Sequence, residues 1–400
     1  MTKRVKKVCI VTGTRAEYGQ LKLLCQKIVL SPKLGLQLVV TGSHLSERHG
    51  ETFREIEADG FRISAKIDLA ISDDSAVGIG MATGRSISGM SETLARLEPD
   101  VVLILGDRYE LLGPAIASLL QRIPLAHLHG GELTEGAVDE SIRHSLTKMA
   151  QLHFVATEVY RRRVIQMGES PESVFNVGGL GVDAIRSLRL IKKKHLENEL
   201  KCKFNRRNLL VTFHPVTLGG DSSLKYLNEM LIALATLRDT SIFFTMPNAD
   251  SGHVLMFNAI ERFVGERPES RFSYKSLGQL RYFSLVQVVD GVVGNSSSGI
   301  HEVPSFKKPT INIGDRQMGR IRCDSIIDCK SDAISIVRAI EQMYSIQFQR
   351  RLSDVSNPYG EGGATDKITH LLESLSIRGT RKKFFDIEFS LSDCQGDAHP

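Results

Sequence analysis

The stretch VVGNSSSGIHEV, residues 292–303, predicts a buried strand that turns directly into a helix. Gly294 and Asn295 open the turn, three serines follow, and Glu302 lies within the first turns of the helix. Small residues let backbone N–H groups approach a ligand closely, and the positive end of a helix favours negative charge. A helix cap would need only one serine, so the whole pattern favours a phosphate site.

Side chains of the same turn extend this prediction from a phosphate to a nucleotide. The hydroxyl groups of Ser296, Ser297 and Ser298 can donate hydrogen bonds, and Gly299 follows them. Glu302 lies about one helical turn beyond Ser298 on the same side, where its carboxylate can accept hydrogen bonds from the vicinal hydroxyls of a ribose.

The rest of the chain repeats this alternation of strand and helix. Continuous apolar runs predict parallel strands that are buried on both faces. These runs lie at residues 8–13, 36–42, 101–107, 124–130, 152–158, 208–215, 241–248, 288–295 and 309–315. Amphipathic helical patterns separate them, which predicts the α/β class with open, doubly wound sheets.

The charged stretch 186–208 interrupts the rhythm and predicts a linker or a surface helix between two domains. We expect one Rossmann-like domain over residues 1–186, a second over 208–362, a helix over 363–378 that returns to the first domain, and an irregular tail over 379–400. Ligands bind at the carboxyl ends of the strands in such sheets, so the two domains should face each other across a ligand-binding cleft. The glycine-rich segment 78–85 lacks the preceding strand of a dinucleotide loop, so we expect a flexible segment there.

Composition limits the class of protein. The chain has 400 residues, of which 42% are hydrophobic and 24% are charged, as in ordinary globular proteins. A formal net charge of +5 is too small for a nucleic-acid-binding surface, and no apolar run approaches the roughly 20 residues that span a bilayer. The six cysteines form no C-x-x-C pair, so we expect reduced thiols, a cytoplasmic protein, and neither nucleic-acid nor membrane partners.

Polar residues follow several predicted strands, at the expected cleft. Arg15 in GTRAEYG (13–19) can hold a diphosphate through two parallel hydrogen bonds. Asp107 and Arg108 follow a very apolar strand, where partial burial would raise the pKa of the Asp107 carboxyl group toward that of a general base. A helix cap is the alternative role for Asp107.

The segment 127–148 concentrates titratable residues. These are His127, His129, Glu132, Asp139, Glu140, Arg143 and His144. His127 and His129 would share one face of a strand, but no third ligand completes a metal site, so we expect none. We interpret the segment as acid–base residues that line the cleft, because neighbouring titratable groups push one another's pKa values apart.

The second domain contributes residues by the same rule. His214 ends a predicted strand and can transfer protons near neutral pH, although a lone histidine is more often structural. Asn248, Lys275 and Arg316 also follow predicted strands.

These motifs together resemble those of the hydrolysing UDP-N-acetylglucosamine 2-epimerases of sialic-acid biosynthesis. In chain order they are GTRAEYG, GSHLSERHGET, GDRYE, HGGE, DESIRHSLTKMAQLHF, FHPVT, PNADSG, GNSSSGIHEV and INIGDRQMGR, over roughly residues 5–375. The resemblance implies the two-domain glycosyltransferase-B-like fold of that family and a homodimer or homotetramer.

The resemblance implies a reaction in two halves, with no metal and no cofactor. A base removes the proton at C2 of the sugar while UDP leaves C1, which gives a glucal-like intermediate. Water then adds at C1 and a proton returns to C2 on the opposite face, so the products are N-acetylmannosamine and UDP.

The resemblance also suggests roles for individual residues. We expect the UDP-sugar to contact Arg15, Arg108, Arg143, His214, Asn248, Lys275, Asn295, Ser297, Ser298, Gly299, Glu302 and Arg316. Asp107 and Asp139 occupy positions of acid–base carboxylates, and His214 would assist the departure of UDP. Many relatives carry a carboxylate where this chain has His129, so that role passes to His129 or Glu132, or the sugar contacts differ.

Other activities fit parts of the pattern. A hydrolysing 2-epimerase of UDP-2,4-diacetamido-2,4,6-trideoxyglucose (UDP-N,N′-diacetylbacillosamine), on the legionaminic-acid route, would meet an acetamido group and a methyl group in place of the C4 and C6 hydroxyls. A glycosyltransferase of the same fold would not need paired carboxylates, so Asp107 and Asp139 favour an epimerase. The density of titratable residues disfavours a non-catalytic sensor of sugar nucleotides.

Overall fold

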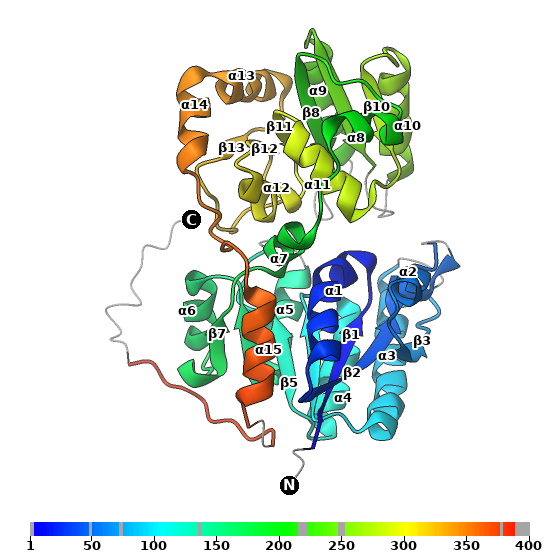
Figure 1. Cartoon of the computed structure of the whole chain (residues 1–400), viewed down its shortest axis with the longest axis vertical. Coiled ribbons are helices and arrows are strands. Elements are labelled where there is room, and N and C mark those ends of the chain that lie inside the picture. Colours follow the sequence, from blue (N-terminus) through cyan, green and yellow to red (C-terminus); the bar gives the residue numbers. More distant parts are fainter. Residues whose placement is uncertain are drawn as a thin grey trace.

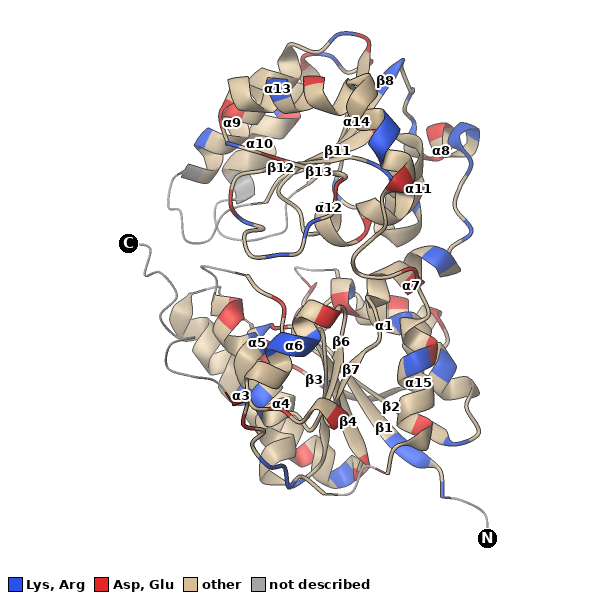
Figure 2. Cartoon of the chain, turned by 90° about the vertical axis from the view of Figure 1, so that its left-hand side faces the viewer, with Lys and Arg blue, Asp and Glu red and all other residues tan. Residues whose placement is uncertain are grey.

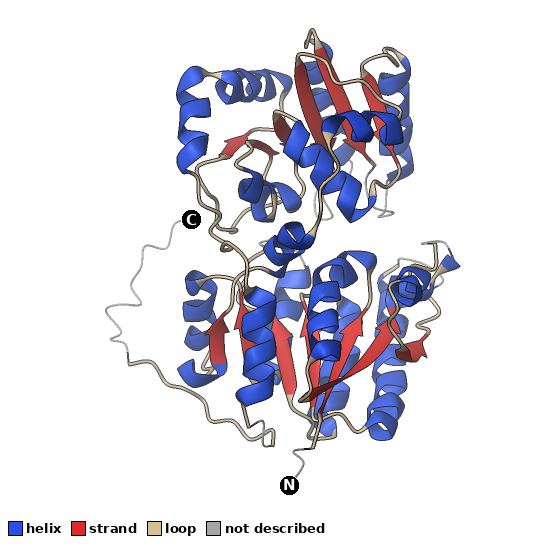
Figure 3. Cartoon of the chain, viewed as in Figure 1, coloured by secondary structure: helices blue, strands red, loops and turns tan. Residues whose placement is uncertain are grey.

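Two α/β halves, stacked along the long axis of the molecule, make up the fold (Figure 1). The computed structural model describes residues 4–47, 50–71, 75–134, 138–214, 222–246, 253–376 and 379–388. In the first half, the strands point toward the second half (Figure 3), so the loops after these strands face the junction.

The first half is built on a seven-stranded parallel sheet of order β3-β2-β1-β4-β5-β6-β7. Its strands are β1 (Lys6–Thr12), β2 (Leu34–Thr41), β3 (Ile63–Ile67), β4 (Val101–Leu105), β5 (Leu125–Leu128), β6 (Leu152–Val155) and β7 (Val174–Asn176). Its helices are α1 (Arg15–Leu30), α2 (Phe53–Ala58), α3 (Ala76–Leu97), α4 (Leu112–Leu120), α5 (Val138–Met149), α6 (Glu158–Gln166) and α7 (Leu180–Ser187). The strand order reverses between β1 and β4, and such switch points bind ligands.

Alternation along β1 explains why its sequence is apolar throughout. Val8 and Ile10 pack against α1, whereas Cys9 and Val11 pack on the opposite face against α3 and α4. All four side chains are fully buried, so each face of the strand contributes to a separate core layer.

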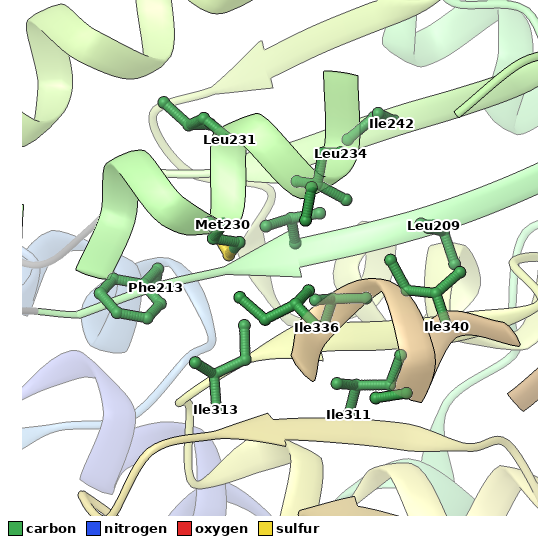
Figure 4. Packing of buried hydrophobic residues seen from close by; sticks show 14 of the residues in the cluster. Leu209, Phe213, Met230, Leu231, Leu234, Ile242, Ile311, Ile313, Ile336 and Ile340 are labelled. Atoms are coloured by element: carbon green, nitrogen blue, oxygen red, sulfur yellow. The ribbon is translucent and has the colours of Figure 1, made fainter. Parts of the chain in front are cut away.

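The second half is built on a six-stranded parallel sheet of order β10-β9-β8-β11-β12-β13. Its strands are β8 (Arg207–Thr212), β9 (Thr240–Thr245), β10 (Arg271–Tyr274), β11 (Gly291–Gly294), β12 (Thr310–Ile313) and β13 (Ile326–Cys329). Its helices are α8 (Lys193–Leu200), α9 (Ser222–Ala235), α10 (His253–Gly265), α11 (Gly278–Val288), α12 (Ser298–His301), α13 (Ala333–Tyr344) and α14 (Ile346–Arg351). Figure 4 shows one core layer of this half, where Leu209 of β8 and Ile311 of β12 lie among side chains of α9 and α13.

The chain passes between the halves twice. The first passage leads into α8, whose Leu196 and Leu200 pack in the core of the second half although they precede residue 208. The second passage leads to α15 (Ala364–Ser374), which packs against α1 through Ile368 and Leu372. Figure 1 shows α15 beside α1 in the first half.

The segment 78–85 is not flexible as predicted, because it lies inside the 22-residue helix α3. Glycines in α3 and α4 allow close packing: a Cβ at Gly89 would lie 2.6 Å from Cγ2 of Ile67, and one at Gly113 would lie 1.9 Å from Oγ of Ser86. These short distances allow α3 to approach both β3 and α4, which offsets the low helix propensity of glycine.

Charged residues are distributed over both halves (Figure 2). Within the described ranges, no helix combines the length and the apolar character needed to cross a membrane. Residues 379–388 form no helix or strand, but they contact the first half: the Lys382 ammonium group donates to the buried Glu169 carboxylate at 2.8 and 2.9 Å.

Candidate active site

A cavity of about 460 Å³ lies between the two halves. Its polar residues from the first half include Arg15, Glu17, Asp107, Arg108, His129, Glu132 and Arg143. Ser297, His301 and Arg320 come from the second half. The first-half residues follow β1, β4 and β5 or lie on α5, so the cavity lies at the carboxyl ends of adjacent parallel strands.

Arg143 organises the first-half wall of this cavity. It lies on α5 and is only 1% exposed. Its guanidinium group donates to the Asp107 carboxylate, to Oε2 of Glu140 at 3.1 Å, to Oγ1 of Thr134 at 2.8 Å and to the carbonyl oxygen of Glu132 at 2.9 Å. Arg143 therefore fixes the loops that follow β4 and β5.

Asp107 and Asp139 form a pair of unequal carboxyl groups. Asp107 lines the cavity, and its side chain is 25% exposed. Asp139, in the first turn of α5, is half-buried; burial and then the negative charge of Asp107 raise its pKa above the ordinary value. Neighbouring groups with separated pKa values suit a division into acid and base.

His129 lies just beyond the end of β5, with a left-handed φ of 64°. The backbone reversal directs its ring away from the strand face that His127 occupies, so the predicted shared face is wrong. Nδ1 of His129 lies 3.2 Å from Oε1 of Glu132, and Oε2 of Glu132 lies 3.8 Å from Nε2 of His301. Burial opposes ionisation of Glu132, but His129, His301 and Arg320 hold its pKa below the ordinary value.

His127 is a structural residue. Its ring is fully buried, with Nε2 2.7 Å from the carbonyl oxygen of Gly106 and Nδ1 3.1 Å from Oγ1 of Thr147. Burial lowers the pKa of His127 to about 3, so the ring is neutral at physiological pH. Among the residues that the structure describes, no group of three His, Cys, Asp or Glu side chains is placed to hold a metal ion.

The serine turn joins β11 to α12, but α12 has only four residues and is shorter than predicted. Gly294 has a φ of 141°, and a Cβ there would lie 1.8 Å from the carbonyl oxygen of Thr212, so only glycine fits. Ser297 lines the cavity. The Ser298 hydroxyl instead accepts a hydrogen bond from Tyr282 at 2.9 Å, and Gly299 packs against Thr310.

Asn295 acts within the protein. Its amide accepts from the His214 N–H at 2.7 Å and donates to the His214 carbonyl at 2.9 Å, so it joins the ends of β8 and β11. Nη1 of Arg316 donates to the Asn295 carbonyl oxygen at 3.1 Å. Burial, and then the charge of Arg316, lower the pKa of His214 to about 4.

Two other predicted contact residues lie apart from this wall. Lys275 is exposed and follows β10, the edge strand of the second sheet. Asn248 lies outside the described residues. The roles predicted for the nucleotide-contacting residues stay predictions, including ribose binding by Glu302, which does not line the large cavity.

Sequence reasoning missed two buried carboxyl groups in this region. Oε2 of Glu17 accepts from the Gly13 N–H at 2.8 Å, and Oε1 of Glu110 accepts from Nε of Arg108 at 2.8 Å. Burial, then the charge of Glu110, raise the pKa of Glu17 to about 7. The spacing T-x-x-E from Thr14 to Glu17 is a capping box, which signals the helix start but not the burial.

His301 and Arg320 were also not predicted as site residues. Nη1 of Arg320 lies 3.4 Å from Nε2 of His301, and the His301 ring packs on Tyr359 with centroids 4.4 Å apart. Burial, followed by the charge of Arg320, lowers the pKa of His301 to about 3. Their positions follow from the packing of the halves, which no local pattern encodes.

Comparison with known proteins defines the class. Residues 26–373 match the profile of the UDP-N-acetylglucosamine 2-epimerase family, so the chain belongs to this family. Over 350 residues it is 41% identical to the GDP/UDP-N,N′-diacetylbacillosamine 2-epimerase (hydrolyzing) of Campylobacter jejuni, covering 88% of this chain and 90% of that protein. It is 38% identical to the polysialic acid biosynthesis protein P7 of Escherichia coli, covering 96% and 98%.

Solved structures agree with this assignment at the level of fold. The S. aureus MnaA–UDP complex superposes with a TM-score of 0.78 at 17% identity and covers 92% of this chain and 96% of that chain. The Neisseria meningitidis UDP-GlcNAc 2-epimerase bound to UDP-GlcNAc gives a TM-score of 0.70 at 18% identity, covering 92% and 99%. The predicted fold, two doubly wound α/β domains of the glycosyltransferase-B-like type, is confirmed.

Proposed function

We propose that the protein is a hydrolysing 2-epimerase that acts on a UDP-linked 2-acetamido sugar. The observation that carries this proposal is the composition of the cavity wall. Asp107, His129 and Glu132 from the first half face Ser297, His301 and Arg320 from the second half across one cavity. Proton-transfer groups and anion-binding groups are therefore within reach of a single sugar nucleotide.

The diphosphate would bind at the cationic part of the wall. Arg15, at the start of α1, and Arg320 supply positive charge, and Ser297 supplies a hydroxyl donor. Hydrogen bonds that strengthen as UDP departs would stabilise the developing charge on the leaving group. No step requires a group from outside the chain other than water.

The proton transfers would fall to the carboxyl groups of the first half. Arg143 orients the Asp107 carboxylate, which suits it to remove the C2 proton as UDP leaves C1. Asp139, whose pKa is raised, and the His129–Glu132 pair are the candidates for returning a proton to C2 after water adds at C1. His214 retains its predicted role beside the departing UDP.

For the substrate we favour UDP-N,N′-diacetylbacillosamine. The 41%-identical C. jejuni protein is a diacetylbacillosamine 2-epimerase, as is a Legionella pneumophila protein at 33% identity. UDP-N-acetylglucosamine is the second candidate, since it gives the family its name. Both substrates share the UDP, the C2 acetamido group and the chemistry at C1 and C2.

The experiment is turnover of each nucleotide in deuterated water. We expect release of UDP and a free 2-epimerised sugar that carries deuterium at C2, with the higher kcat/KM on the diacetamido substrate. Sugar release without deuterium at C2 would exclude epimerisation through C2 deprotonation. A higher kcat/KM on UDP-N-acetylglucosamine would select the second substrate.

Replacement of Asp107 tests the assignment of the base. Asp107→Asn should lower kcat by about 100-fold to 10,000-fold, the usual contribution of a positioned acid or base, and should leave UDP binding within a factor of about two. Asp354→Asn, at an exposed position, is the control. Normal turnover in Asp107→Asn would show that another group removes the proton.

A further inference from the structure

A second, much smaller cavity lies between the two halves. Its volume is about 10 Å³, close to the space that one water molecule requires. Its polar residues are Gln20, His129, His301 and Glu302, and Gly179, Gly181, Val182 and Tyr359 complete the wall. A cavity of this size is too small for an organic ligand.

Two polar atoms of this wall are buried and, within the part of the chain that the structure describes, have no hydrogen-bond partner. They are Nε2 of His129, from the first half, and Oε2 of Glu302, from the second half. Buried polar groups are almost always paired, either within the protein or with an ordered water. Water can donate to a carboxylate and can donate to or accept from an imidazole, and the Gln20 amide offers a third partner.

The other side of the His129 ring is already engaged. Nδ1 lies 3.2 Å from Oε1 of Glu132, so His129 lies between the small cavity and a carboxylate that also lines the large cavity. Arg320 and His301 are the remaining charged or titratable groups at this junction. One water would therefore connect Glu302 with the proton-transfer groups of the first half.

We propose that this cavity binds one ordered water between Glu302 and His129, and that this water transfers protons between Glu302 and the His129–Glu132 pair. In one direction, the Glu302 carboxyl group gives its proton to the water, and the water gives one of its own protons to Nε2 of His129. The proton on Nδ1 passes to Glu132. The water is regenerated, and the net change is one proton moved from Glu302 to Glu132.

The second part of this inference rests on the proposed function. A 2-epimerase removes a proton from one face of C2 and returns a proton to the other face, so its acid and base end each turnover with exchanged protonation states. A relay that moves a proton across the junction of the halves restores the starting state. Burial raises the pKa of Glu302 to about 7, which lets this group hold or release a proton under physiological conditions.

The water site can be tested without any reaction. A crystal structure of the full chain near neutral pH, at about 1.5 Å resolution, should show one water within about 2.6–3.2 Å of both Nε2 of His129 and Oε2 of Glu302. A direct bond between the two side chains, or no water there, would overturn the proposal. So would a UDP complex in which a ribose hydroxyl occupies the water position.

The relay is tested by altering the volume of the cavity from outside its polar groups. Val182→Ile adds one methyl group at the wall and should displace the water, whereas Val182→Ala enlarges the space and should retain it. We expect kcat to fall at least tenfold in Val182→Ile, with KM unchanged, and to stay near the wild-type value in Val182→Ala. Crystal structures of both variants would report the water directly.

A second variant guards against misfolding of the first. A Cβ at Gly181 would lie 2.9 Å from Oε1 of Glu302, so Gly181→Ala should also displace the water. Wild-type turnover in a folded variant that lacks the water would overturn the relay. If the wild-type protein turned over neither nucleotide, the proposed function would fail, while the crystallographic test of the water site would still stand.

Discussion

Arg143 is the side chain on which the first-half wall of the active site depends. It is buried, and it joins the carboxylates of Asp107 and Glu140 to the loop that carries Thr134 and Glu132. A buried cation of this kind contributes mainly by pairing charges that would otherwise be buried alone.

Removal of this charge should therefore affect folding as well as turnover. We expect Arg143→Met to lower the free energy of unfolding by about 3–5 kcal/mol, because it leaves partly buried carboxylates without their donor. Urea denaturation measures the change. Arg54→Met removes an exposed partner of Glu51 and should leave the unfolding midpoint unaltered. An equal effect of both substitutions would refute the special role of Arg143.

Glu17 should make stability depend on pH. Its pKa is raised from 4.5 to about 7, so the folded protein holds a proton that the unfolded chain releases in this range. Its contribution is complete below about pH 4.5 and is lost as the pH rises through 7, a change of about 3 kcal/mol. The free energy of unfolding of Glu17→Gln, minus that of the wild type, should rise by this amount between these pH values.

The comparison with the wild type removes the contribution of the buried histidines. His44, His127 and His301 have lowered pKa values and favour folding as pH rises, but they are common to both proteins. Glu199→Gln, at an exposed position of α8, should give a difference that does not vary with pH. A difference for Glu17→Gln that is equally flat would mean that Glu17 ionises normally in the fold.

Among the elements, α15 shows how a distant segment completes a core. Its first N–H groups, at Ala364 and Thr365, donate to the Asp183 carboxylate of α7 at 3.2 and 2.6 Å. Asp183 is buried, so it caps α15 from a different helix.

Loss of this cap should weaken the docking of α15. We expect Asp183→Ala to lower the free energy of unfolding by about 2 kcal/mol, the upper range for a helix cap, because the N–H groups it leaves are buried. Thermal unfolding followed by circular dichroism measures this change. Asp366→Ala, in the first turn of α15, removes only an exposed ion pair with Lys27 and should have a much smaller effect.

The central elements were predictable because their sequences record burial on both faces. β1, β4 and β8 lie within the apolar runs that predicted them. The strands β3, β7, β10 and β13 were missed, because short edge strands such as ISAKI and RFSY mix polar and apolar residues. The helix α3 was missed because its glycines reflect close packing with β3 and α4, which becomes visible only in three dimensions.

At the scale of the whole molecule, the two halves have separate cores and share the large cavity. Two hydrogen bonds also cross the junction, from Nη1 of Arg15 to Oγ of Ser276 at 2.9 Å and from Nε2 of Gln279 to the carbonyl oxygen of Gly19 at 3.2 Å. A ligand held by residues of both halves should therefore stabilise the folded protein as one unit.

UDP tests this coupling. At a concentration about 100 times its Kd, UDP should stabilise the wild-type protein by about 2.7 kcal/mol and raise the unfolding midpoint of both halves together. Arg15→Ala should need far more UDP for the same shift, whereas Lys22→Ala, which removes a pair with Asp59 on the same helix, should behave as the wild type. Two separate transitions in saturating UDP would contradict binding across the junction.

The site could be predicted only in part for the same reason. Asp107 and Ser297 stand directly after apolar strands, and the cleft of two doubly wound sheets gathers such positions. The contact of His301 with Glu132 depends on how the halves meet. The left-handed backbone at His129, and the internal use of the Asn295 amide, arise from loop geometry that composition does not reveal.

The position of α15 has a consequence for how the chain folds as it is made. Ile368 and Leu372 belong to the core that surrounds β1, and the Lys6 ammonium group in β1 donates to the carbonyl oxygen of Leu375 at 2.8 Å. A ribosome that has released only the first 200 residues has therefore delivered an N-terminal half with an uncovered apolar face. That half must wait, exposed to chaperones, until nearly the whole polypeptide has been translated.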